Sequence, residues 1–94
     1  MIRSFKGKLA ENVWDGKRPK AFPAELLERA DAKLAILDAA IDVNDLRIPP
    51  GNRLEQLKGD RAGQWSIRIN KQWRVCFTWS AGDAFDVEIV DYHP

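Results

Sequence analysis

Alternation of apolar and polar residues dominates the last third of the chain and restricts the folds open to it. Three segments carry it, residues 64–70, 73–79 and 85–90, and in each one apolar side chains recur at every second position. A period of two places these side chains on one face of a strand, so each segment predicts a strand with one buried face. Three strands in succession with short connections favour an antiparallel meander. A less regular stretch at residues 53–57 predicts a fourth strand.

The middle of the chain has helical spacing instead. Apolar residues recur at steps of three and four along one run: Leu26, Ala30, Leu34, Leu37 and Ile41. This spacing predicts a helix of about five turns with one apolar face. Pro23 suits its first helical position, and the prolines at 49 and 50 end the helical region and open a loop.

The N-terminal segment predicts smaller elements. Residues 1–5 predict a short edge strand, residues 8–15 a short helix ended by Gly16, and residues 17–20 a loop. Ninety-four residues are enough for one small domain, so residues 1–94 are expected to form a single one. The predicted fold class is α+β with two layers, in which N-terminal helices pack on one face of an antiparallel sheet.

The strand register follows from the requirement that paired strands bury their apolar residues on the same face. Pairing Ile69 with Trp73 leaves a loop of three residues. Pairing Trp79 with Phe85 leaves a loop of five residues. These two pairings fix which side chains share the second face of the sheet.

The second face of the predicted sheet is polar and includes two arginines that face each other. Its members are Arg68, Arg74, Cys76, Glu88 and Tyr92. Arg68 lies opposite Arg74, and like charges in that position repel. Either a carboxylate such as Glu88 lies between the two guanidinium groups, or an anionic ligand does.

The charges are unevenly distributed along the chain. Fifteen Lys and Arg against 14 Asp and Glu give a net charge of +1, which excludes an overall polycation. Residues 47–79 nevertheless carry seven basic and two acidic side chains, whereas residues 80–94 carry four acidic and no Lys or Arg side chains. A basic central segment can face phosphates. The alternative is that these charges only cover the solvent side of the elements.

The composition also argues against several function classes. One cysteine excludes an internal disulfide, and one Cys with one His cannot build a closed zinc site, so no metal or other cofactor is expected. The apolar runs are too short to span a membrane, and the N-terminus lacks a signal-peptide pattern. The expected location is therefore the cytoplasm, with Cys76 as a reduced thiol and no membrane partner.

Two stretches of the sequence carry a resemblance to a known family. They are residues 52–74, NRLEQLKGDRAGQWSIRINKQWR, and residues 87–93, VEIVDYH; the opening MIRSF also fits. Together they resemble the HigB branch of the RelE-type toxins, the toxin halves of bacterial type II toxin–antitoxin systems, also called plasmid maintenance killer proteins. The resemblance covers essentially the whole chain and is weakest across residues 6–25.

This resemblance implies a fold, an activity and partners. The fold is the α+β fold of RelE-like and microbial ribonuclease-like proteins. The activity is cleavage of messenger RNA in the ribosomal A site, where the 2′-hydroxyl of the RNA attacks the adjacent phosphate without a metal ion. The implied partners are a HigA-type helix-turn-helix antitoxin, the ribosome with its mRNA, and operator DNA, the last only through the antitoxin.

The resemblance also implies roles for residues of the site. Arg74 matches the phosphate clamp, because its planar guanidinium suits a phosphate bidentately. Lys58 supplies a second cation, and His93 titrates near neutrality and is the natural proton-transfer group. Tyr92 is expected to position the scissile nucleotide. Asp91 is expected to orient His93 or to tune its charge.

One position departs from the family pattern. Some HigB proteins carry a histidine where this chain has Glu55. Two roles stay open: Glu55 is the acid–base partner of His93, or it is a surface acid that pairs with Arg53 or Arg61. Four further basic side chains of the central segment are expected to bind RNA: Arg53, Arg61, Arg68 and Lys71.

Two functions from different classes follow. The first is a ribosome-dependent mRNA endonuclease toxin. The second is a degenerate member of the same fold that binds an antitoxin and tunes operator repression without cutting RNA; Glu55 in place of a histidine favours it.

Overall fold

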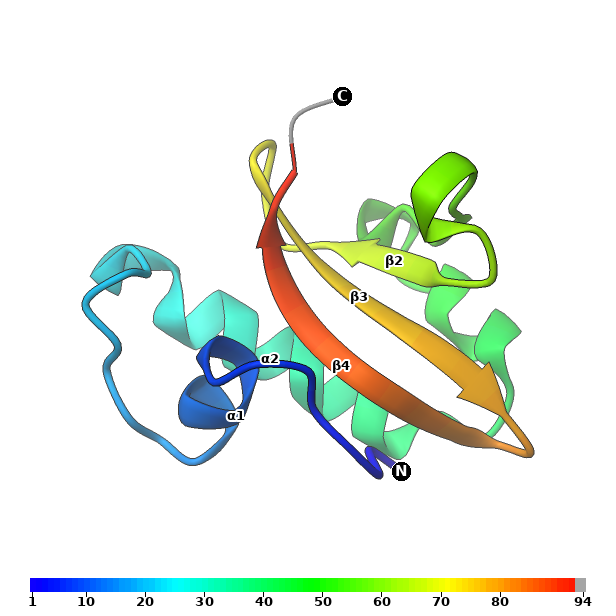
Figure 1. Cartoon of the computed structure of the whole chain (residues 1–94), viewed down its shortest axis with the longest axis horizontal. Helices are drawn as coiled ribbons and strands as arrows, with labels where there is room; N and C mark the ends of the chain where they lie inside the picture. The colour runs from blue at the N-terminus through cyan, green and yellow to red at the C-terminus, as the bar shows by residue number, and fades with distance from the viewer. Residues whose placement is uncertain (93–94) are drawn as a thin grey trace.

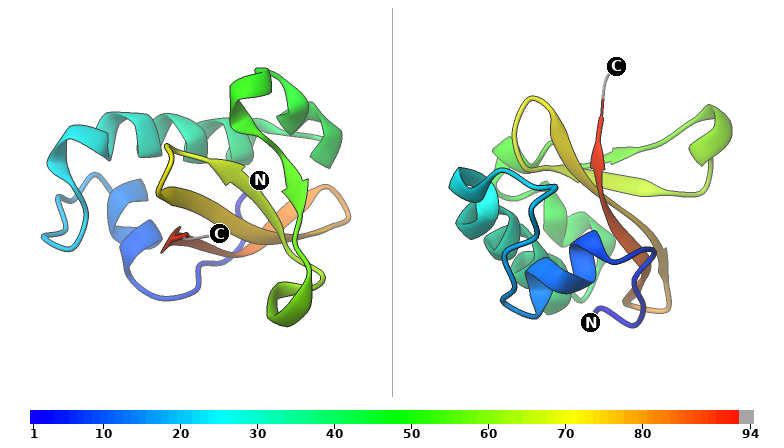
Figure 2. Two further views of the ribbon diagram at one scale, coloured as in Figure 1. Left: turned by 90° about the horizontal axis from the view of Figure 1, so that it is seen from above. Right: turned by 60° about the vertical axis from the view of Figure 1, so that its left-hand side comes forward.

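Two layers make up the fold, one of helices and one of strands. The computed structural model describes residues 1–92. The helices are α1 (Leu9–Trp14) and α2 (Leu27–Ala39), and the strands are β1 (Glu55–Gln56), β2 (Trp65–Arg68), β3 (Trp73–Ser80) and β4 (Asp83–Asp91). The strands form one antiparallel sheet in the order β1-β2-β3-β4. Helix α2 passes behind the strands in Figure 1 and runs along the sheet in the view from above in Figure 2.

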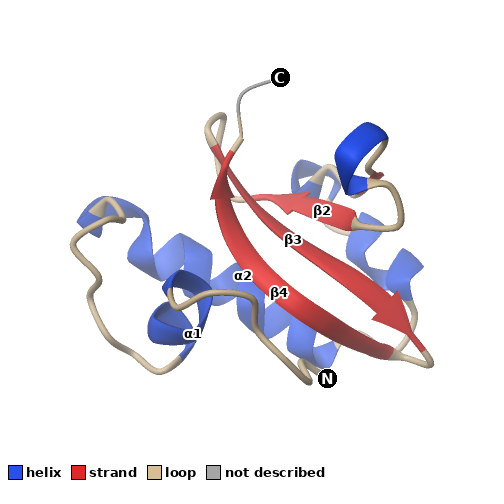
Figure 3. Ribbon diagram, viewed as in Figure 1, coloured by secondary structure: helices blue, strands red, loops and turns tan. Residues whose placement is uncertain are grey.

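Four short 3-10 helices lie between these elements within residues 1–92. They are η1 (Ala24–Leu26), η2 (Val43–Arg47), η3 (Pro50–Asn52) and η4 (Gly59–Arg61). Figure 3 shows how helices and strands segregate. The predicted α+β class with helices on one face of an antiparallel sheet is therefore confirmed. The predicted fourth strand is present but pairs over two residues only, Glu55 with Ser66 and Gln56 with Trp65.

The register of the β2–β3 hairpin is the predicted one. Ile67 pairs with Val75, and Arg68 pairs with Arg74. Ile67 and Val75 are fully buried on the helix side of the sheet. The two arginines alternate with them and therefore lie on the opposite face.

The register of the β3–β4 hairpin is only partly the predicted one. Arg74 pairs with Val90 as expected, but Trp79 pairs with Ala84 and not with Phe85. The physical reason is a β-bulge at Asp86, whose φ of 52° adds one residue to β4. The predicted five-residue loop is consequently a two-residue turn, Ala81–Gly82, with positive φ at both positions, as a type I′ turn requires.

The long helix is shorter than its apolar spacing predicts. Helix α2 ends at Ala39, and Ile41, predicted on the buried face, is 83% exposed. The cause is the N-terminal cap of the next helix. Asp42 accepts a hydrogen bond from the backbone of Asn44, and Asp45 accepts from the backbones of Ile41 and Asp42. This capping box draws the chain out of the α2 direction before Ile41 can pack.

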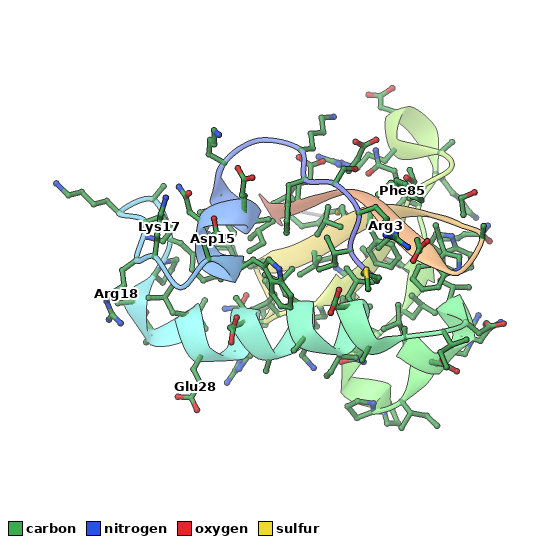
Figure 4. The ribbon with its side chains drawn as sticks, turned by 90° about the horizontal axis from the view of Figure 1, so that it is seen from below. Arg3, Asp15, Lys17, Arg18, Glu28 and Phe85 are labelled. Atoms are coloured by element: carbon green, nitrogen blue, oxygen red, sulfur yellow. The ribbon has the colours of Figure 1, made fainter. Side chains whose placement is uncertain are left out.

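The N-terminal segment lies beside β4. The strand predicted over residues 1–5 is present as two isolated parallel bridges, Ile2 with Ala84 and Phe5 with Val87. Arg3 forms an ion pair with Asp83 at the hairpin end of β4. Figure 4 shows Arg3 and Phe85 on this side of the molecule, from below. The predicted short helix is confirmed as α1, and Gly16 follows it with a φ of 82°.

The core fills the space between the two layers. Its largest fully buried side chains include Leu34 and Leu37 of α2 and Phe77 of β3. Trp73 is buried at the start of β3 and meets Phe22 edge to face, with ring centroids 4.9 Å apart. Among residues 1–92, no helix is long and apolar enough to cross a membrane.

Candidate functional site

The face of the sheet that turns away from α2 carries a row of polar side chains. Glu55, Ser66, Cys76 and Glu88 are paired in sequence across the four strands. Arg68, Arg74 and Val90 form the next row. Residues paired across strands share a face, so the structure confirms the predicted polar face.

A cleft opens at one end of this face. It has a volume of about 350 Å³. The residues that line it come from the β1 segment, the β2–β3 hairpin and the end of β4: Arg53, Glu55, Arg68, Asn70, Lys71, Arg74 and Tyr92. Four of them are cationic and one is a carboxylate, so the cleft suits an anionic ligand.

Arg74 is held in a fixed position in this cleft. Its side chain is 15% exposed, and its Nη1 donates to Ser66 Oγ at 2.8 Å and to the Arg53 carbonyl at 3.4 Å. The same nitrogen lies 3.2 Å from Oε1 of Glu55. The guanidinium carbon lies 5.2 Å from the centre of the Tyr92 ring, within the range of a cation–π contact. The guanidinium group is thus positioned before any ligand binds.

The carboxylate that offsets the charge of the Arg68–Arg74 pair is not the one named from the sequence. The carboxylate that reaches the pair is Glu55, not Glu88, and it binds Arg74. The predicted partners of Glu55, Arg53 and Arg61, are therefore wrong. Across the described chain, residues 1–92, no ion pair neutralises Arg68. The positive charge of Arg68 is therefore available to an anionic ligand.

Glu88 belongs to a separate ion pair on the same face. Its Oε1 accepts from Nη1 of Arg61 at 2.8 Å, and the same nitrogen donates to Oε1 of Gln64 at 3.0 Å. The hydrogen bond to Glu88 raises the pKa of the Arg61 guanidinium above its ordinary value. This pair ties η4 to β4 across the sheet.

Comparison with known proteins identifies the family. Residues 3–93 match the family described as RelE-like toxin of type II toxin–antitoxin system HigB. The chain belongs to this family of HigB-like toxins. The resemblance found in residues 52–74 and 87–93 is confirmed.

Two relatives extend over nearly the whole chain. "Toxin HigB-1" of Vibrio cholerae is 46% identical over 87 residues, which cover 92% of each chain. "Endoribonuclease HigB" of Proteus vulgaris is 34% identical over 93 residues, 99% of this chain and 100% of that protein. This HigB-like toxin is thus homologous, across 99% of the sequence, to a protein named as an endoribonuclease.

Solved structures agree on the fold. The YoeB–YefM toxin–antitoxin complex of Staphylococcus aureus has a chain with a TM-score of 0.62 and 17% identity, covering 100% of this chain and 99% of that one. The YoeB/ParE toxin of Agrobacterium tumefaciens gives a TM-score of 0.52 at 17% identity, covering 99% of this chain and 100% of that one. These likenesses confirm a RelE-like fold.

The sequence-predicted site residues of this HigB-like toxin do not all meet in the cleft. Arg53, Glu55, Arg68, Lys71, Arg74 and Tyr92 line it. Two of the predicted cations do not line the cleft within the described residues. Lys58 is exposed just before η4, and Arg61 belongs to η4. Their roles stay predictions.

The end of β4 is fastened to the β2–β3 hairpin. The carboxylate of Asp91 accepts from Nε2 of Gln72 at 3.0 Å, and the backbone N–H of Tyr92 donates to the Gln72 carbonyl at 2.6 Å. Asp91 is exposed beside the cleft and does not line it. His93, the predicted proton-transfer group, lies outside the described residues.

Two residues of the site were missed by the sequence reasoning. Ser66 is fully buried and accepts the shortest hydrogen bond of Arg74. Asn70 lines the cleft, and its Oδ1 accepts from the backbones of Gln72 and Trp73 at 2.9 and 2.8 Å, which shapes the hairpin turn. The alternation that selected Arg68 also places Ser66 on the polar face, so that signal was available.

Cys76 is close to the arginines but is not a reactive group. It is fully buried, and burial raises the pKa of its thiol to about 11. The thiolate is the nucleophile and the metal ligand, so the neutral thiol is inert near neutral pH. Within residues 1–92, no group of three or more His, Cys, Asp or Glu residues is placed to hold a metal ion.

Proposed function

We propose that this HigB-like toxin is a ribosome-dependent endoribonuclease that cleaves mRNA in the ribosomal A site. The observation that carries the proposal is the fixed guanidinium group of Arg74 beside the Tyr92 ring in a cationic cleft. Membership of the HigB-like family and a relative named as an endoribonuclease support it.

Arg74 is the proposed phosphate clamp. When the RNA 2′-hydroxyl attacks the adjacent phosphorus, negative charge grows on the non-bridging oxygens of the phosphate. A cation that is already oriented stabilises this charge without reorganisation during the reaction. The contacts of Arg74 to Ser66 and to the Arg53 carbonyl provide that orientation. A phosphate displaces the Glu55 carboxylate, whose side chain is 47% exposed and can turn towards solvent.

The reaction also needs a base and an acid. Glu55 is the one carboxylate that the described part of the chain contributes to the cleft, and we assign it the removal of the 2′-proton. His93 is the proposed acid that protonates the 5′-oxygen as its bond to phosphorus breaks. The products are a 2′,3′-cyclic phosphate and a 5′-hydroxyl. Asp91, next to His93 in sequence, is the proposed group that orients it.

Tyr92 and the cations other than Arg74 bind the RNA. The Tyr92 ring offers a face on which a base stacks beside the bound phosphate. Arg53, Arg68 and Lys71 line the cleft and meet neighbouring phosphates. Lys58 and Arg61, at η4, are assigned to RNA further along the strand.

The proposed partners follow from the same assignment. A HigA-type helix-turn-helix antitoxin inhibits the toxin and connects it to operator DNA, and the ribosome presents the mRNA. These partners and the substrate place the protein in the cytoplasm.

The substitution Arg74→Ala tests the site. The variant is expected to fold, to leave growth unaffected on induction, and to lose mRNA cleavage on purified ribosomes by about 10²-fold or more, the scale of a lost transition-state contact. Arg47→Ala is the matched control, since Arg47 is an exposed arginine whose side-chain partner is Asn44. Cleavage at the parent rate by folded Arg74→Ala overturns the assignment.

The Glu55–Arg74 ion pair favours a second candidate function. A carboxylate on the guanidinium group competes with phosphate, as expected of a module that binds an antitoxin and tunes operator repression without cutting RNA. Inducible expression of the parent separates the two. Growth arrest that a co-expressed antitoxin relieves supports the enzyme, and unaffected growth supports the module.

A further inference from the structure

The cationic surface continues beyond the cleft around Arg74. A second cleft of about 450 Å³ adjoins the first, because Arg68, Asn70 and Lys71 line both. It extends from the β2–β3 turn to α2, which contributes Arg29 and Lys33. The two clefts therefore lie next to each other at the end of β2.

The second cleft is more strongly charged than the first. Arg29, Lys33, Arg68 and Lys71 line it, and no carboxylate from residues 1–92 does so. A hollow beside α1 shows the contrast, since its lining mixes cations with acids. Lys17 and Arg18 line that hollow together with Asp15, Glu28 and Asp31, and Figure 4 labels four of these five. The second cleft is thus lined by more cations, and by fewer acids, than the hollow beside α1.

Lys33 is held at the cleft by a buried partner. Its Nζ donates to Oδ1 of Asn52, and Asn52 is fully buried and donates in turn to the carbonyls of Leu46 and Ile48. Burial and the nearby charge of Arg29 lower the pKa of Lys33. The two cations repel each other, and an anion between them relieves that repulsion.

We propose that the second cleft, through Arg29 and Lys33, binds the phosphate backbone of the RNA next to the cleavage position. The proposal rests on the proposed function, since it takes the Arg74 cleft as the place of cleavage. Arg68 and Lys71 belong to both clefts, so a strand bound at Arg74 and Tyr92 reaches the second cleft past these two cations.

The lining favours RNA over an acidic protein segment. Protein partners are anchored chiefly by apolar side chains in fully desolvated pockets. Ile69, the apolar side chain among the lining residues that the described chain contributes, is only 3% exposed, so the cleft has no exposed apolar side chain on which a protein partner could be anchored. A polyanion whose phosphates lie along its outside fits such a surface.

The test measures binding of a single-stranded RNA oligonucleotide whose 2′-oxygens are methylated to prevent cleavage. Fluorescence anisotropy over a range of salt gives the affinity and the slope of log K against log salt. The double variant Arg29→Gln with Lys33→Gln is compared with a control, Lys6→Gln with Lys17→Gln, whose lysines are exposed and line neither cleft. Glutamine at position 33 keeps a donor for Asn52.

The expected result is weaker binding by the double variant and a slope smaller by about 1.4, which is about 0.7 for each lost phosphate contact to a single strand. The control keeps the affinity and slope of the parent. If the double variant unfolds, Arg29→Gln alone is used, with an expected change of about 0.7 in slope.

Three results overturn the proposal. These are a double variant with the affinity and slope of the control, a parent that does not bind the RNA, and a double variant that loses antitoxin binding but keeps RNA binding. Cleavage on ribosomes, measured separately, distinguishes failure of this proposal from failure of the proposed function. A parent that binds RNA through the second cleft but never cleaves mRNA removes the proposed function only.

Discussion

The guanidinium carbon of Arg74 lies 5.2 Å from the centre of the Tyr92 ring, although the two residues belong to the start of β3 and the segment just after β4. The register that pairs Arg74 with Val90 places Tyr92 on the same face, two residues further on. The bond from the Tyr92 N–H to the Gln72 carbonyl holds that segment in place. The proposed phosphate clamp, Arg74, and the proposed stacking platform, Tyr92, are therefore held next to each other by the same pair of strands.

Loss of the Tyr92 ring is expected to weaken RNA binding more than loss of its hydroxyl. Stacking of a base on an aromatic ring contributes about 1–3 kcal/mol, so Tyr92→Ala lowers kcat/KM for mRNA cleavage by about ten-fold or more. Tyr92→Phe keeps the ring and is expected to stay near the parent. Single-turnover rates on ribosomes measure both. Equal losses in the two variants would assign the effect to the hydroxyl and contradict a stacking role.

Removal of the Glu55 charge is expected to slow cleavage without weakening RNA binding. Glu55→Gln cannot accept the 2′-proton, and general-base catalysis contributes about 10²–10⁴-fold, so a loss within that range is expected. Because the variant also frees Arg74 of its carboxylate, the affinity for methylated RNA should rise or stay the same. Exposed Glu25→Gln on η1 is the control. Faster cleavage by Glu55→Gln would show that this carboxylate competes with the substrate.

Much of the sheet and of the site could be predicted because period-two patterns report which residues share a face. The pairing of Arg68 with Arg74 needed only the apolar sets of two strands and a short loop. Position 86 could not be predicted in the same way. Its bulge depends on a φ of 52° and on a hydrogen bond from the Asp86 N–H to Ser4 Oγ, from a segment distant in the sequence.

The end of α2 and the partner of Glu55 were also predicted wrongly, because both depend on side-chain contacts that a periodic pattern does not report. Ile41 continues the apolar spacing of α2, but the caps at Asp42 and Asp45 decide where the helix ends. Glu55 takes Arg74 as its partner because β1 pairs with β2 through Glu55 and Ser66, and Ser66 itself binds Arg74. Side-chain partners across strands depend on this register and not on separation along the chain.

The Cys76 thiol is expected to resist modification while the protein is folded. Burial raises its pKa from 9.0 to about 11, so at pH 8 the thiolate population is small and inaccessible. Iodoacetamide should label Cys76 slowly in buffer and rapidly in denaturant, as mass spectrometry can follow. Rapid labelling of the folded protein would contradict the burial of this residue.

The same shift predicts a loss of stability at alkaline pH. An acid whose pKa is raised on folding binds its proton more tightly in the native state. The contribution of the Cys76 proton to the free energy of unfolding is therefore complete below pH 9 and is lost as the pH rises from 9 to about 11. Unfolding in urea at several pH values measures it, and Cys76→Ala is expected to remove this part of the dependence. An unchanged alkaline slope in that variant would assign the dependence to other groups.

Asn52 is expected to be the polar residue on which stability depends most strongly near the second cleft. It is fully buried, its Nδ2 donates to the carbonyls of Leu46 and Ile48, and its Oδ1 accepts from Lys33. Asn52→Ala leaves these partners unsatisfied, and a loss of about 2–4 kcal/mol in the free energy of unfolding is expected. Asn44→Ala, which removes only an exposed contact to Arg47, should change it by about 0.5 kcal/mol or less. Urea denaturation compares the two, and equal effects would show that the buried bonds of Asn52 do not stabilise the loop that carries η2 and η3.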